Sequence, residues 1–451
     1  MPGSSLSLTR SVVFRHGLRL LALLAVTLPL SVAAAETPPW DEDTLTGSWH
    51  GTRSSLFEKG IALEFTHRSD VLQNLEGGLQ RGGAWLGYTD ARGLFDLEKL
   101  YGWSNMTGYV QFHSTLGDKP NEWYLASSMG TDNIEAPANT AQLYHAWVQK
   151  SWLEDSVSLL LGLYPVDAEF YVTDTSGLFL HPSLGMAAEV AQSGLNGPPV
   201  YPLGSLGTRI KYVSPNRTAY LQAALLDGVP GDPANPYGTQ IKLNPADGTF
   251  AIAEIGYTPL EAGHTFEPVV PEGAAKMEPT IKLHEKYEEF NKTAFGVWRY
   301  STRFDDLTDL DASGNPLQRD SSGWYLLAER TLYSEADNPN DGLAAFFRFG
   351  AASADIHQSD WSASLGARYR GLLKGRDDDI AGLAISVSHA SPKHQQLNAS
   401  TDRETAFEAT YRIQLKPWLA VQPLWQRIVA PGMVTGVRDA TLLGTRLEIF
   451  L

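Results

Sequence analysis

Charged side chains at alternate positions of apolar segments are the residues of this chain that could do chemistry. Arg209, Arg348, Arg368 and Arg412 each lie where apolar and polar residues alternate, so each is expected on the polar face of a strand. A row of guanidinium groups inside a sheet could donate hydrogen bonds to a polar molecule. Each could equally belong to a solvated wall without a ligand, and the sequence leaves both open.

Two acids and one aromatic residue extend this set. Asp167 and Glu169 are two positions apart directly after an apolar strand, so they share one face of an extended segment. They could line a passage, or form a rim pair that fixes a loop. Trp147 falls on the same face of its predicted strand as the polar residues His145 and Gln149. It is therefore either a stacking platform inside a barrel or a residue of the membrane girdle.

No catalytic arrangement accompanies these residues. Ser114 follows His113, but the spacing of a nucleophile elbow is absent. The two-residue spacing of Asp167 and Glu169 does not establish the separation of about 5 Å or more that glycosidase carboxylates need. The sequence therefore predicts a protein that is not an enzyme and holds no cofactor and no metal.

The element that must position these side chains is a sheet, and it is clearest in residues 403–451. From Phe407 to Leu415 the odd positions are apolar and the even positions are polar or charged, which is a period of two. Lys416-Pro417-Trp418 predicts a tight turn, and Leu419 to Gln426 alternate again. Leu443 to Leu451 form a third alternating run. A soluble sandwich also alternates, but such strands in an exported chain favour a transmembrane barrel.

The first 35 residues indicate export. They carry three arginines, an apolar run from Leu18 to Val32, and Ala33-Ala34-Ala35 before Glu36. This pattern predicts a cleaved signal peptide over residues 1–35; the apolar run is shorter than the roughly 20 residues that a membrane span needs. The chain has 35 basic and 51 acidic side chains, which argues against a nucleic-acid partner.

The remainder reads as one domain. Residues 36–60 predict an entry segment with one short helix, and residues 61–451 predict an all-β, antiparallel, up-and-down transmembrane barrel. Short turns such as Ser214–Arg217 contrast with long links at Asp227–Gly248, Pro259–Lys292, Phe304–Ser322 and Ser391–Glu404, which we expect on the outer rim. Pro259–Lys292 could hold a helix or be an extracellular loop, and the sequence leaves this open.

Several motifs in a fixed order resemble the carbohydrate-selective porins of the OprB family, over essentially all of the chain after residue 35. They are Leu45-Thr46-Gly47-Ser48-Trp49-His50-Gly51-Thr52-Arg53, Asp96-Leu97-Glu98-Lys99-Leu100, Asn133-Ile134-Glu135-Ala136, Asp167-Ala168-Glu169-Phe170, Leu178-Phe179-Leu180, Tyr325-Leu326-Leu327-Ala328-Glu329, Tyr369-Arg370-Gly371-Leu372-Leu373 and Lys416-Pro417-Trp418-Leu419. His181 stands where the family usually has Asn, which bears on sugar preference.

The resemblance implies a barrel of 16 strands in the Gram-negative outer membrane, with an inward loop that narrows the channel for glucose-like monosaccharides. Residues 118–140 are the long polar segment available for that loop, and would place Glu135, Asp167 and Glu169 opposite Arg209. The partners implied are sugars, outer-membrane lipid and the barrel-assembly machinery; whether the pore is a monomer or a homotrimer stays open. A general diffusion porin and an outer-membrane enzyme are the alternative functions.

Overall fold

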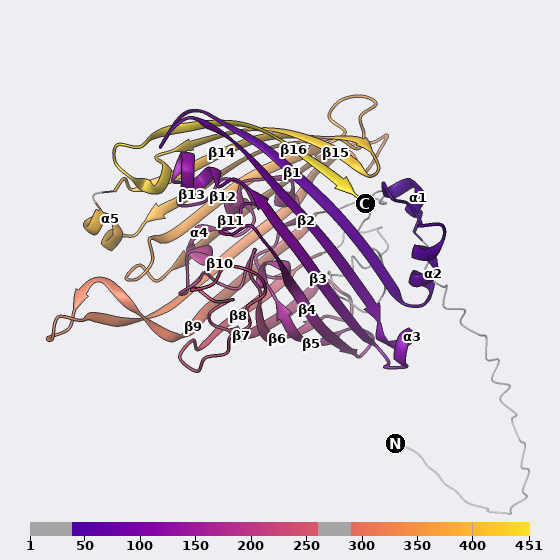
Figure 1. Cartoon of the computed structure of the whole chain (residues 1–451), viewed down its shortest axis with the longest axis horizontal. Coiled ribbons are helices and arrows are strands. Elements are labelled where there is room, and N and C mark those ends of the chain that lie inside the picture. Colours follow the sequence, from indigo (N-terminus) through magenta and orange to yellow (C-terminus); the bar gives the residue numbers. More distant parts are fainter. Residues whose placement is uncertain (1–37, 260–289, 399) are drawn as a thin grey trace, which may run out of the picture. The chain divides into compact units, whose positions relative to one another are not determined.

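A computed structural model describes residues 38–259, 290–398 and 400–451 of the chain. The expected signal peptide, residues 1–35, lies outside the described residues. From Thr37 onward the chain forms one compact unit. Its strands form a closed barrel in which each strand pairs antiparallel with the next and β1 pairs with β16 (Figure 1). The predicted all-β barrel of 16 strands is therefore confirmed.

The strands alternate with short helices and turns along the chain. They are β1 Ile61–Gly78, β2 Gly82–Asp96, β3 Met106–Gly117, β4 Thr140–Trp152, β5 Val157–Tyr164, β6 Ser205–Val213, β7 Ala219–Asp227, β8 Thr249–Tyr257, β9 Asn291–Leu310, β10 Pro316–Ser334, β11 Gly342–Ala352, β12 Ser359–Arg370, β13 Ile380–Ala390, β14 Arg403–Lys416, β15 Leu419–Val429 and β16 Arg438–Phe450. The helices are α1 Trp40–Asp43, α2 Thr52–Glu58, α3 Leu97–Tyr101, α4 Ala188–Ala191 and α5 Pro392–Asn398, with single turns η1 Asn121–Leu125, η2 Val166–Ala168, η3 Asp174–Leu178, η4 Pro182–Leu184 and η5 Pro431–Met433.

The period of two in the sequence separates an inner polar face from an outer apolar one. On β14 and β15 the side chains of Glu408, Gln422 and Gln426 are buried inside, while Phe407 and Trp425 face outward and are exposed. Outward apolar residues recur on other strands, including Phe112, Ile210, Ile255, Phe347 and Leu383. An apolar outer band suits a barrel surrounded by lipid. Among the described residues, no helix is long and apolar enough to cross a membrane.

Two expectations about the connections are wrong. Phe304–Ser322 is not a long link, because β9 and β10 continue as a paired hairpin to a turn at 311–315 (Figure 1). Neighbouring strands pair with β9 only as far as Tyr300 and with β10 only as far as Gly323, so this hairpin extends past the barrel wall. Most of its residues are polar, and Phe304 packs against Tyr300 and the buried cluster next to it.

The second correction concerns Pro259–Lys292. In an up-and-down barrel the connections alternate between rims, and the link from β8 to β9 falls on the same rim as the 417–418 turn from β14 to β15. Its described ends, Thr258 and Phe290, therefore lie on the rim opposite 228–248 and 391–402, not beside them. Whether it contains a helix concerns residues outside the described ones. The strand β2 ends at Asp96, whose carboxylate accepts the Glu98 and Lys99 N–H groups at the start of α3.

Candidate constriction site

Two loops fold from one rim into the barrel. The first inward loop, residues 118–139, joins β3 to β4, and the second inward loop, residues 165–204, joins β5 to β6. Apolar residues of the second loop, such as Phe170 and Leu180, are completely buried against the strands. The inward loop expected at 118–140 is present. The second loop was not expected, although its repeated Pro and Gly residues are a loop signal.

Carboxylates on the barrel wall hold the second inward loop by its main chain. Glu408 of β14 accepts the N–H groups of Leu180 and His181 at 2.8 and 2.7 Å. Glu254 of β8 accepts the Tyr171 N–H at 3.0 Å, and Glu329 of β10 accepts the Thr175 N–H at 2.9 Å. Hydrogen bonds to an ionised acceptor are stronger than neutral ones, so three strands fix this loop.

Two buried arginines secure the same loop. Arg209 of β6 forms a two-pronged ion pair with Glu169, with both N–O distances 2.7 Å, and their side chains are only 2% and 6% exposed. Arg348 of β11 donates to the Thr173 hydroxyl at 3.0 Å and to the Gly185 carbonyl at 2.7 Å. Both guanidinium groups therefore donate their hydrogen bonds to the second inward loop.

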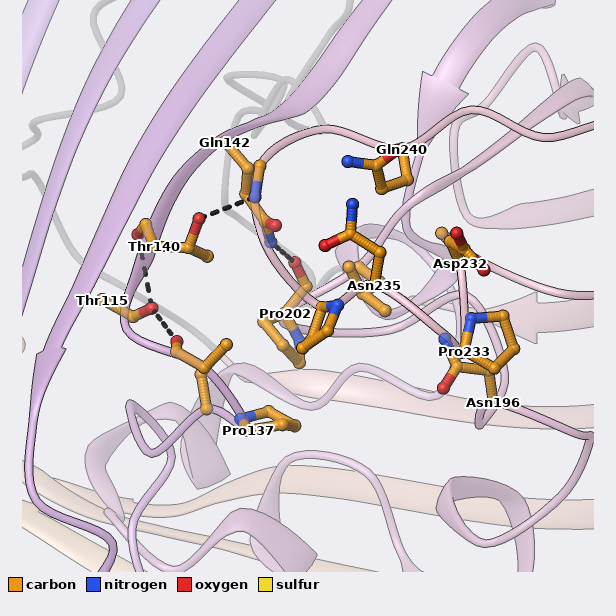
Figure 2. Close-up of a pocket in the computed structure, with 16 residues that line it drawn as sticks. Thr115, Pro137, Thr140, Gln142, Asn196, Pro202, Asp232, Pro233, Asn235 and Gln240 are labelled. Atoms are coloured by element: carbon orange, nitrogen blue, oxygen red, sulfur yellow. Dashed lines mark hydrogen bonds between the residues drawn. The ribbon is translucent and has the colours of Figure 1, made fainter.

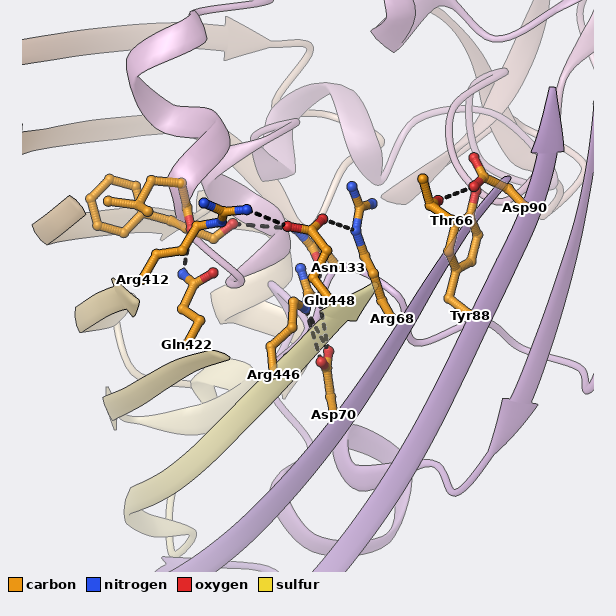
Figure 3. A network of polar contacts seen from close by, with 12 residues as sticks. Thr66, Arg68, Asp70, Tyr88, Asp90, Asn133, Arg412, Gln422, Arg446 and Glu448 are labelled. Atoms are coloured by element: carbon orange, nitrogen blue, oxygen red, sulfur yellow. Dashed lines mark hydrogen bonds and ion pairs between the residues drawn. The ribbon is translucent and has the colours of Figure 1, made fainter. Parts of the chain in front are cut away.

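The first inward loop is tied to strands β1, β14 and β16. Arg446 of β16 forms a buried pair with Asp70 of β1, at 2.6 Å, and also donates to the Asn133 amide oxygen at 2.7 Å. Glu404 of β14 accepts the N–H of Ser128 at 2.9 Å. These contacts hold Asn133 against the seam between β1 and β16 (Figure 3).

Next to this clamp is a chain of charges that the loops leave accessible. Glu448 of β16 accepts from Arg68 of β1 at 2.8 Å and from Arg412 of β14 at 2.9 Å (Figure 3). The exposed fractions are 30% for Arg68, 18% for Arg412 and 13% for Glu448, against 2% for Arg209. On β1, Arg68 is closer than Asp70 to the rim that bears the short turns. The arginine–glutamate–arginine chain therefore lies nearer to that rim than the contacts that hold the first inward loop.

The polar surface continues across β2 and β3. Arg92 pairs with Asp90 at 2.6 Å, and Asp90 accepts from the Gln111 amide at 2.8 Å. Tyr109 donates its hydroxyl proton to Gln111 at 3.2 Å. The Tyr109 ring is stacked on Trp147, with the centroids 5.2 Å apart. The guanidinium group of Arg92 and the aromatic rings of Tyr109 and Trp147 therefore lie on neighbouring strands of one wall.

This arrangement is that of a narrowed, charged channel, and the comparisons with known proteins agree. Residues 80–451 match the Carbohydrate-selective porin, OprB family. The chain belongs to this family. It is 22% identical to Porin B of Pseudomonas aeruginosa, over 95% of this chain and 96% of that protein. The high-pH structure of Pseudomonas putida OprB has a TM-score of 0.77 and 18% identity, covering 91% of this chain and 99% of that one. The low-pH structure of the same protein has a TM-score of 0.57 and 15% identity, over the same shares.

The protein is thus an outer-membrane channel for carbohydrates, and the expected site residues can be placed in it. Of those residues, Arg412 lies in the accessible chain of charges. Arg209, Glu169 and Arg348 support the second inward loop. Trp147 lies inside, stacked on Tyr109.

The other expected residues make separate contacts. Asp167 accepts the Tyr201 N–H at 3.0 Å within the second inward loop. The carboxylate of Glu135 accepts the Asn121 N–H at 3.2 Å within the first inward loop. Arg368 places its guanidinium 4.3 Å from the Phe290 ring. The expected arrangement, with all three acids facing Arg209, is therefore not what the structure has. Each of Glu135, Asp167 and Glu169 instead contacts a partner in or beside its own loop.

The alternation of polar and apolar residues is a sequence signal for Arg68, Asp70, Arg446 and Glu448. Glu64 and Thr66 mark the polar phase of β1, and the same phase continues to Arg68 and Asp70. What alternation cannot show is that β1 pairs with β16, with Arg68 directly opposite Glu448. Barrel closure therefore assembles this part of the porin from the two ends of the sheet.

Burial sets the charge of groups on the inward loops. It raises the pKa of Glu135 to about 7, against the opposing effect of the Asn121 N–H and of Lys119. Burial lowers the pKa of His181 to about 4, so this histidine is neutral at pH 7. Burial also raises the pKa of Glu189 above its ordinary value. The loops that narrow the porin therefore carry less charge than their sequence implies.

A small cavity lies where the inward loops meet residues 228–248 (Figure 2). Its lining includes Gln142, Asn196, Asn235 and Gln240, and its volume is about 70 Å³. Among the described residues no group of histidines and acids is placed to hold a metal ion.

Proposed function

We propose that this carbohydrate channel passes glucose-like monosaccharides, which bind transiently to the chain Arg68–Glu448–Arg412. The observation that carries the proposal is the difference in exposure. The arginines of this chain are 30% and 18% exposed, whereas Arg209, which the second inward loop uses, is 2% exposed. Only an accessible guanidinium can exchange a water molecule for a sugar hydroxyl.

The chemistry of the wall suits a neutral polyol. Glu448 accepts hydrogen bonds and the two arginines donate them, so adjacent hydroxyl groups of a sugar find both kinds of partner. Tyr109, which is partly buried, adds an aromatic surface on β3. Because the second inward loop fills part of the lumen, these groups border a narrowed passage. Binding must remain weak, with Kd of roughly millimolar, so that the sugar leaves quickly.

Single-channel conductance in a planar bilayer tests the proposal. Glucose should reduce the ion current of the parent in a saturable way at millimolar concentration. Arg68→Ala and Arg412→Ala should each weaken this block by about tenfold, as expected for loss of one charge-assisted hydrogen bond. Arg403→Ala is the matched control, because Arg403 pairs with Asp402 at the exposed end of β14.

The outcomes separate two kinds of channel. A linear, unsaturable reduction of current by glucose, the same in every variant, would identify a general diffusion porin and overturn the proposal. Saturable block that survives both substitutions would place the sugar elsewhere on the lumen wall.

A further inference from the structure

The motif Leu45 to Arg53 takes no part in the channel, yet its residues make specific contacts at the barrel seam. The strands β1 and β16 pair from Thr66 opposite Phe450 onward. Residues 61–64 of β1 therefore extend past the end of β16 and pair with β2 on one side only. A strand edge of this kind presents unpaired main-chain groups, which proteins normally cover.

Arg53 of α2 covers this edge. Its Nε and one terminal nitrogen donate to the Leu63 carbonyl at 3.0 and 2.7 Å. The other terminal nitrogen donates to a main-chain oxygen of Leu451 at 3.1 Å, and to the Thr44 hydroxyl at 3.2 Å. One planar side chain thus joins the overhanging end of β1 to the residue that follows β16.

Two tryptophans fix the position of the guanidinium. Its central carbon lies 4.0 Å from the Trp40 ring and 5.0 Å from the Trp49 ring. Trp40 and Arg53 are almost fully buried, at 2% and 1% exposed. Cation–π contacts gain strength when they are desolvated, and a buried Arg with fixed donors loses little freedom on binding.

The remaining motif residues shape the segment that carries Arg53. Gly47 has φ of +63°, and a Cβ there would come within 2.5 Å of the Asp41 carboxylate, which accepts the Ser48 N–H at 2.7 Å. Trp49 donates its indole proton to the Thr46 hydroxyl at 3.0 Å. The Leu45 N–H donates to the Phe450 carbonyl at 2.8 Å. Both ends of the motif therefore contact the end of β16.

We propose that residues 38–60 form a clasp that keeps the β1–β16 seam closed, with Arg53 as the group that binds the main chain on both sides of it. The clasp acts on barrel closure and not on sugar binding. It is therefore independent of which sugar the channel carries.

Hydrogen exchange read by mass spectrometry on the folded porin tests the clasp. In Arg53→Ala, peptides covering 61–66 and 447–451 should exchange about tenfold faster or more, because bonds to a charged donor are lost. The Leu451 N–H is a specific reporter, since it donates to the Phe65 carbonyl across the seam. Peptides from β8 should be unchanged and serve as the internal reference.

The matched control is Arg217→Ala. Arg217 also donates to a main-chain carbonyl, that of Glu154, at 2.9 Å on the same rim, but it is away from the seam. If Arg53→Ala gives no folded barrel, Arg53→Lys decides, because an ammonium group keeps the charge but lacks the planar fork and should leave the seam less protected. Seam exchange within twofold of the parent in the folded Arg53 variant, or equal acceleration by Arg217→Ala, would overturn the proposal.

Discussion

Arg68 and Glu448 occupy directly opposed positions on the first and last strands, and their side chains meet at 2.8 Å across the seam of the barrel. The same carboxylate also holds Arg412 at 2.9 Å. Two cations therefore share one anion where the barrel closes.

The first prediction concerns this shared anion. Glu448→Gln leaves Arg68 and Arg412 without their common anion and adds one positive charge to the local sum. Because these groups are partly exposed to the lumen, the channel should shift toward anion selectivity. The reversal potential in a salt gradient measures the shift. Asp402→Asn, at an exposed rim pair, should leave it unchanged, and equal shifts in both variants would show that only net charge matters.

The second prediction concerns the support of the second inward loop. Arg209→Ala leaves the Glu169 carboxylate buried without its cation, a change that costs about 3–5 kcal/mol for a buried pair. We expect residues 165–204 to become sensitive to protease and the conductance to rise as the loop leaves its place. Combining Arg209→Ala with Glu169→Gln should restore part of the stability, since the stranded charge is removed. A double variant as unstable as the sum of both changes would contradict this explanation.

The alternation of β14 to β16 predicted both the barrel and the inner phase that carries Arg412, because lipid on one side and water on the other impose a period of two. Alternation stops being informative where both faces meet the same environment. Most side chains of the β9–β10 hairpin beyond Tyr300 are polar, so the sequence predicted a link there. The second inward loop was missed although its Pro and Gly residues mark a loop, because local sequence does not show that Phe170 and Leu180 pack inside the barrel.

The roles of individual arginines depend on partners that are far away in the sequence. Arg348 and Arg412 have similar sequence surroundings, yet Arg348 bonds to Thr173 of a loop and Arg412 to Glu448 of the last strand. Which inner arginine is accessible is decided by where the loops pack. Local sequence does not specify that packing. The arginines of the candidate wall could therefore be predicted, but not which of them are accessible.

The third prediction is a pH dependence of the first inward loop. Burial raises the pKa of Glu135 from 4.5 to about 7, so the folded loop binds this proton more tightly than the unfolded chain does. The contribution of the neutral acid to the stability of the folded loop is fully present below about pH 4.5 and is lost as the pH rises toward 7. Protection of residues 118–139 from hydrogen exchange, corrected for intrinsic rates, should be greater at pH 5 than at pH 8. Glu135→Gln should remove this difference; persistence of the difference in the Gln variant would assign it to another group.

The last prediction concerns the link between Tyr257 and Asn291. In a barrel of this topology the link leaves β8 on the rim of the 417–418 turn, and short turns mark the periplasmic rim of outer-membrane barrels. An epitope tag inserted between Tyr257 and Asn291 should therefore bind antibody only after the outer membrane is permeabilised. A tag at 311–315, the turn of the β9–β10 hairpin, should bind antibody on intact cells, and this variant controls for expression. Because connections alternate between rims without exception in this sheet, labelling of both sites on intact cells would contradict the strand order itself and not merely the orientation of the barrel.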